Sequence, residues 1–82
     1  MKSIDILLSL DGVELEVSKT IDGHISVNYK DAEVKDNLFL VFDPGRGKTL
    51  EEACDDYLTK IRGKKLVFNA YTNDRREVVV LG

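Results

Sequence analysis

The strongest structural signal in the chain is the stretch TLEEACDDYLTKIR, residues 49–62. Thr49 and Glu52 have the spacing of a capping box, in which each side chain accepts a hydrogen bond from a backbone N–H at the helix start. Acidic residues crowd the N-terminal half, basic residues lie near the C-terminus, and Gly63 follows as a stop signal. One helical face is apolar, with Leu50, Ala53, Cys54, Tyr57, Leu58 and Ile61. The sequence therefore predicts one amphipathic helix over residues 49–62.

The part of the chain before this helix is predicted to contain four β-strands. Residues 3–10 and 13–18 alternate apolar and polar residues around Asp11-Gly12, which suits a tight hairpin turn. A second Asp-Gly pair precedes the strand at residues 25–29. A tight turn there would set the apolar rows on opposite faces, so we expect a bulged or longer turn with Gly23 in a G1 bulge.

Two further segments lie between these hairpins and the helix. Residues 31–37 are polar and are predicted to form a loop. Residues 38–42 are apolar at every position, which predicts a central strand buried on both faces. Pro and Gly in residues 43–47 then predict a turn that ends this strand.

After the helix, residues 64–72 and 75–81 are predicted to pair as a hairpin around Asn73-Asp74. The expected fold is α+β, with the order β-β-β-β-α-β-β and a single helix packed on one face of a mostly antiparallel sheet. A chain of 82 residues fits one domain, residues 1–82.

Composition and charge exclude several function classes. Twelve basic and fifteen acidic residues give a net charge of −3, which disfavours nucleic-acid binding, including through a patch of Lys64, Lys65, Arg75 and Arg76. No segment approaches the ~20 apolar residues of a membrane span, and we expect a cytoplasmic protein. The lone Cys54 and lone His24 lack partners for a metal site or a nucleophile. We expect no enzyme, no metal and no cofactor.

The segment GRGKT, residues 45–49, resembles the end of a nucleotide-binding P-loop. That pattern requires a glycine five positions before Gly47, where Phe42 stands, so nucleotide hydrolysis is not expected. A weaker hypothesis is an anion- or phosphate-binding site at the helix start, formed by Arg46, Gly47, Lys48 and Thr49. The alternative is a plain turn between strand and helix.

Apolar and acidic surface predicts a protein interface instead. One helix covers one face of a sheet, and the other face is then closed by the first three strands or by another molecule. The candidate residues on that face are Phe39, Val41, Val67, Tyr71, Val78 and Val80. The acidic helix face, which would contact a basic partner, contains Glu51, Glu52, Asp55 and Asp56.

Residues 47–53, Gly-Lys-Thr-Leu-Glu-Glu-Ala, resemble the Gly-x-Thr-x-Glu-Glu-Ala helix start of HicB-type antitoxins. The resemblance covers less than a tenth of the chain, and no residue roles are carried over from it. The leading functional prediction is a small non-enzymatic protein-binding module, an adaptor or inhibitor-like accessory protein of the phage or mobile-element type. Its partner is another protein or a second copy in a homodimer. The alternative is the small-anion site at residues 45–49.

Overall fold

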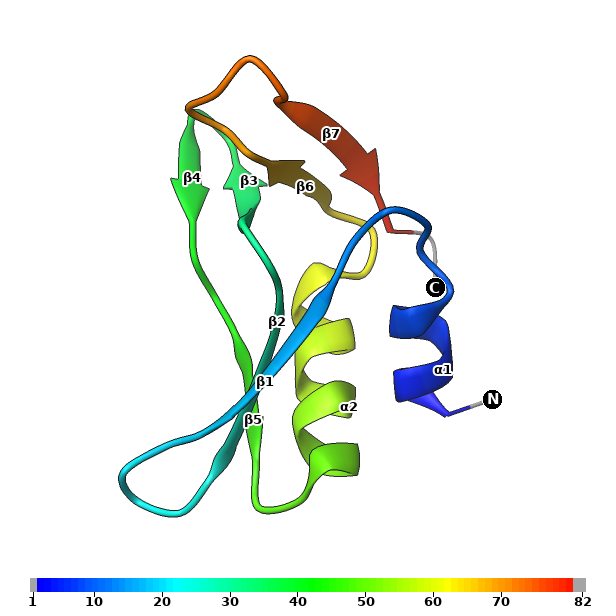
Figure 1. The fold of residues 1–82 in the computed structure, drawn as a ribbon, viewed down its shortest axis with the longest axis vertical. Helices are drawn as coiled ribbons and strands as arrows, with labels where there is room; N and C mark the ends of the chain where they lie inside the picture. The colour runs from blue at the N-terminus through cyan, green and yellow to red at the C-terminus, as the bar shows by residue number, and fades with distance from the viewer. Residues whose placement is uncertain (1, 81–82) are drawn as a thin grey trace.

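The computed structural model describes residues 2–80 and has two antiparallel sheets with helices packed against them. The first sheet has the order β1-β2-β5 and the second the order β4-β3-β6-β7. Figure 1 shows the two sheets at opposite ends of the long axis, connected where β2 continues into β3 and where β4 continues into β5. The elements are α1 Ser3–Leu8, β1 Leu15–Lys19, β2 Ile25–Tyr29, β3 Ala32–Asp36, β4 Phe39–Val41, β5 Gly45–Gly47, α2 Leu50–Ile61, β6 Lys65–Phe68 and β7 Arg76–Val79. The α+β class with one main helix is confirmed, and the strand order roughly agrees.

Helix α2 begins and ends where its sequence signals place it. The Glu52 N–H donates to Thr49 Oγ1 at 3.2 Å, which confirms Thr49 as the N-cap. The Glu52 carboxylate accepts from the Lys48 N–H at 2.9 Å, one residue earlier than a capping box requires. Gly63 follows the helix with φ of +74°, as its stop role requires.

The backbone of β5 lies directly against α2. At Gly47, a Cβ atom would come within 2.6 Å of Ala53 N and of Glu52 Cβ. At Gly45, it would overlap Tyr57 Cβ and the Ala53 carbonyl oxygen. Both glycines are therefore required by close helix–strand packing, which explains the glycine-rich segment without any bound phosphate.

A pair of buried tyrosines joins three elements in the core. The Tyr29 N–H donates to the Tyr57 hydroxyl at 3.0 Å, and the rings meet edge to face with centroids 5.7 Å apart. The Tyr29 hydroxyl in turn donates to the Leu7 carbonyl of α1. Burial raises the pKa of Tyr29 to about 12. Each buried polar tip thus has a partner, as a stable core requires.

The predicted first strand is wrong, since residues 3–8 form helix α1. Leu7 is fully buried in the core, and Ile4, Ile6 and Leu10 pack around it. Apolar residues at positions 4, 7 and 8 fit a helical spacing as well as an alternating one, so the pattern alone was ambiguous. Gly12 does have positive φ, but its turn connects a helix to β1.

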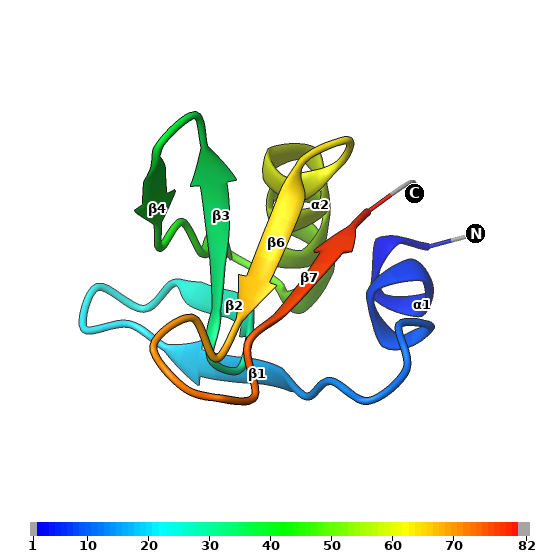
Figure 2. The ribbon, with the colours of Figure 1, turned by 90° about the horizontal axis from the view of Figure 1, so that it is seen from above.

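The segment between β2 and α2 also differs from the prediction. The predicted polar loop at residues 31–37 contains β3, whose Ala32 and Val34 are buried. The predicted buried strand at residues 38–42 forms β4 at a sheet edge (Figure 2), and the predicted turn contains β5. Charged residues alternate with the buried Ala32 and Val34 in β3, so a strand with one buried face was predicted as a polar loop.

The two remaining hairpins had different outcomes. In the β1–β2 hairpin, Thr20 pairs with His24, and the Gly23 N–H donates to the Thr20 carbonyl. Gly23 has a φ of +87°, so the predicted bulged turn is confirmed.

The final hairpin exists, but Leu66 pairs with Val78 and Phe68 with Arg76. The expected two-residue turn at Asn73-Asp74 is wrong, and the longer loop shifts the register by an odd number of residues. That shift exchanges the two faces of β7 relative to the prediction.

Substitution of Gly45 by alanine tests the contact between β5 and α2. We expect Gly45→Ala to lower the free energy of unfolding by roughly 1–3 kcal/mol, because the added methyl group overlaps the helix backbone. Arg46→Ala, at the exposed position between the glycines, is the control and should change it by less than about 0.5 kcal/mol. Urea unfolding followed by circular dichroism measures both. Equal effects of the two substitutions would contradict the packing role.

Candidate functional site

Two backbone amides just before the start of α2 are already bonded within the chain. The Arg46 N–H donates to Asp56 Oδ2 at 2.9 Å, and the Lys48 N–H donates to Glu52 Oε2 at 2.9 Å. Carboxylates of the protein itself thus accept the bonds that an anion would need there. The anion-binding hypothesis stays a prediction, but two of its donors are already bonded.

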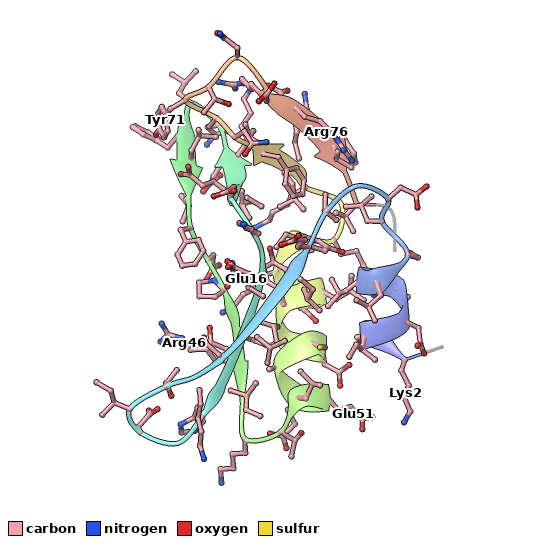
Figure 3. All side chains as sticks on the ribbon, viewed as in Figure 1. Lys2, Glu16, Arg46, Glu51, Tyr71 and Arg76 are labelled. Atoms are coloured by element: carbon pink, nitrogen blue, oxygen red, sulfur yellow. The ribbon has the colours of Figure 1, made fainter. Side chains whose placement is uncertain are left out.

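Arg46, one of the four residues of that hypothesis, points away from the helix start. Gly45 and Gly47 face α2, so the Arg46 side chain between them faces the other side of the strand. Figure 3 shows Arg46 pointing away from α2. It lines an outer groove together with Lys19 and His24. The structure therefore separates the charge of Arg46 from the helix N-terminus.

The acidic helix face is largely occupied by bonds within the chain. Asp56 accepts from the Arg46 N–H and lies 3.0 Å from Lys60 Nζ, Glu52 accepts from Lys48, and Asp55 accepts from the Ser3 hydroxyl. The backbone hydrogen bond from Arg46, and then Lys60, hold the pKa of Asp56 below its ordinary value. Among the four predicted acidic residues, Glu51 is the one that has no such bond within residues 2–80.

The predicted apolar face does not form one surface. Val67 is fully buried, contrary to expectation, so it offers nothing to a partner. It lies between Glu33 and Glu77 on the neighbouring strands, and Glu77 bonds Lys65 at 3.3 Å and Arg75 at 3.0 Å. Val78 and Val80 pack partly against the core. Phe39, Val41 and Tyr71 remain exposed.

The exposed apolar surface is concentrated on and beside β4. Leu38 is 94% exposed, Phe39 73% and Phe42 59%, and Val41 is also exposed. Sequence reasoning included Phe39 and Val41 but missed Leu38 and Phe42, because five consecutive apolar residues are typical of a buried strand. No signal within the segment distinguishes an edge strand from a central one.

Among the four edge strands within residues 2–80, β4 is the one without a charged side chain. The other three edges contain charges, at Glu16 and Lys19 in β1, Arg46 in β5, and Arg76 and Glu77 in β7. Charged side chains are a common protection of edge strands against pairing with other chains. The β4 edge is therefore apolar and carries no charge of its own.

A groove of about 620 Å³ adjoins the end of β4. Its lining comes from both sheets and from the loop that follows β6. We call it the acidic–aromatic groove, and its lining residues are Glu16, Asn28, Asp31, Ala32, Glu33, Phe42, Asn69, Ala70, Tyr71 and Thr72. Phe42 belongs both to this groove and to the apolar surface at β4, so the two features are continuous.

The other candidate groups serve the fold or form local pairs. Burial raises the pKa of the Cys54 thiol, as expected for a core cysteine. The His24 imidazole lies 3.1 Å from the Asp22 carboxylate in the β1–β2 turn. Of the predicted basic patch, Lys65 and Arg75 pair with Glu77, and Arg76 lies over the Phe68 ring. Within the described residues, no helix is long and apolar enough to cross a membrane.

The hydrogen bond from Arg46 to Asp56 predicts a pH dependence of stability. Because folding lowers the Asp56 pKa from 3.8, the stabilisation is present above about pH 4 and is lost as pH falls through the lowered value. We expect Asp56→Asn to be less stable than the wild type at pH 7 and to lose less stability on acidification to pH 3. Glu51→Gln, on the same helix, is the control and should keep the wild-type profile. Urea unfolding across this pH range measures the difference, and parallel profiles for all three proteins would refute it.

Known proteins do not supply a function for this arrangement. Comparisons of the chain with protein-family models, with curated proteins and with solved structures gave no match. The exposed edge of β4 and the acidic–aromatic groove are the two surface features on which a proposed function can be based.

Proposed function

We propose that the chain is a small non-enzymatic protein-binding module that binds its partner along the free edge of β4. The observation that carries this proposal is the exposure of Leu38, Phe39 and Phe42 at an uncharged sheet edge. Exposed large apolar side chains concentrated on one segment in this way are typical of an interaction site. An adaptor or inhibitor role in the cytoplasm fits this surface, and a single buried cysteine suits that reducing compartment.

The edge itself supplies the mode of binding. β4 pairs with β3 on one side, and its other side carries N–H and C=O groups that no strand within residues 2–80 pairs. An extended segment of a partner would add there as a further strand of the sheet, bonded through its backbone. Alternation along the strand places Phe39 and Val41 on one face and Leu40 on the other, so both faces of the added strand would find apolar contacts.

The acidic face of α2 has a smaller part in this proposal. Three of its four carboxylates already bond atoms of this chain, so binding a basic partner there would have to compete with those bonds. By contrast, the side chains at β4 are exposed in the free protein. Burying one phenylalanine side chain in an interface would contribute on the order of 1.5–3 kcal/mol.

A charge introduced at β4 tests the proposal. We expect Phe39→Glu to remove the captured partner in affinity capture from the native host with mass spectrometry, because the carboxylate would be buried against an apolar strand. Ile21→Glu is the matched control. It makes the same kind of change at a fully exposed apolar residue in the β1–β2 turn and should retain the partner.

The same pair of variants examines self-association. Size-exclusion chromatography with light scattering, run at several concentrations, would show a wild-type dimer that Phe39→Glu converts to a monomer if a second copy occupies the edge. Retention of every captured partner, and of any dimer, by Phe39→Glu would disprove binding through β4.

A further inference from the structure

The acidic–aromatic groove has an unbalanced charge. Glu16, Asp31 and Glu33 contribute three carboxylates to its lining, and none of its ten lining residues is lysine, arginine or histidine. Asn28 donates to the Glu16 carboxylate at 3.2 Å, but within the described residues no cationic side chain forms an ion pair with any of the three. A neighbouring cation would therefore find unneutralised negative charge there.

Two aromatic rings line the same groove. Tyr71 is 86% exposed, and Figure 3 shows its side chain pointing outward at the periphery of the molecule. Phe42, which directly follows β4, is also exposed. Aromatic faces attract cations electrostatically, and carboxylates beside them add to the attraction. The aromatic rings distinguish this groove from a simple cluster of acidic residues, because they provide apolar contact as well as charge.

The wall that carries Tyr71 is held in place by backbone hydrogen bonds. The Asn69 N–H donates to the Asp31 carbonyl at 3.0 Å, which joins the loop after β6 to the start of β3. Thr72 then donates to the Asn69 carbonyl through both its N–H and its hydroxyl, each at 3.0 Å. The backbone of this wall is thus fixed by hydrogen bonds within the chain, which lowers the entropy cost of binding.

We propose that this groove binds the guanidinium group of an arginine on the partner strand. The guanidinium is planar, always charged and weakly hydrated, so it stacks on aromatic rings and bonds carboxylates in a way that an ammonium group does not. Phe42 connects the groove to the end of β4, so a strand added along β4 delivers its side chain there. The assignment of this arginine to a protein partner rests on the proposed function, whereas the affinity of the groove for a guanidinium does not.

The test uses a short peptide, so that binding at β4 is not required. We would titrate acetyl-Ala-Arg-Ala-amide into the ¹⁵N-labelled protein and follow the backbone amides by NMR. The expected result is a saturating shift at Glu33, Asn69 and Tyr71. The same peptide with citrulline, which keeps the shape and loses the charge, should bind about tenfold more weakly, and the lysine peptide should fall between the two.

Charge variants separate the groove from the overall acidity of the protein. Glu33→Gln should weaken binding of the arginine peptide several-fold, whereas Glu51→Gln, which removes the same charge from the exposed face of α2, should leave it unchanged. Tyr71→Ala, at a side chain too exposed to support folding, should also weaken it. Equal binding of the arginine and citrulline peptides, equal effects of the two glutamine variants, or no shift at these amides would each overturn the proposal.

The Phe39→Glu protein makes the two proposals distinguishable. It should bind the arginine tripeptide as the wild type does, because Phe39 is not among the groove residues. If Phe39→Glu loses the partner while the arginine and citrulline peptides bind equally, the β4 proposal is supported and the guanidinium-site proposal is refuted. If Phe39→Glu retains the partner while the arginine peptide binds more tightly than the citrulline peptide, the guanidinium site is supported and binding of the partner at β4 is refuted.

Discussion

The contact between the β5 backbone and α2 sets the positions of the other elements. Gly45 and Gly47 allow the strand to approach the helix so closely that no Cβ atom fits between them. The Tyr57 hydroxyl on the same helix then accepts the β2 N–H at Tyr29, and Tyr29 bonds α1. One helix therefore organises the first sheet and the N-terminal helix together. It does so through backbone proximity and satisfied polar groups as much as through apolar area.

The segment before β5 belongs to the second sheet. β5 lies in the first sheet beside α2, whereas the preceding strand β4 pairs with β3 at the edge of the second sheet (Figure 2). The most apolar segment of the chain is thus placed where the helix does not cover it. Natural proteins commonly protect such edges with charge, as β1, β5 and β7 do here. An uncharged apolar edge is a risk of aggregation unless a partner covers it, so we propose that the partner binds there.

The proposed partner strand would meet two kinds of chemistry on one continuous surface. Along β4 it finds apolar side chains and backbone groups that no strand within residues 2–80 pairs, which favour any extended apolar segment. At Phe42 it reaches the acidic–aromatic groove, which adds a preference for a cation. Affinity from the edge and selectivity from the groove would then have separate origins, so each is tested by its own substitutions.

The sequence by itself determined α2, its cap at Thr49 and the bulged turn at Gly23, because these depend on local spacing and on positive φ. It also assigned Phe39 and Val41 to uncovered apolar surface, and both are exposed. Only the tertiary structure decided that residues 3–8 form a helix. Their apolar pattern fits both a helical and an alternating spacing, and the helix is the form that buries Leu7 in the core. It likewise made residues 38–42 an edge and brought Glu33, Phe42 and Tyr71 to one groove. Those outcomes depend on which strands become neighbours, and long-range pairing leaves no mark in the local pattern of any one segment.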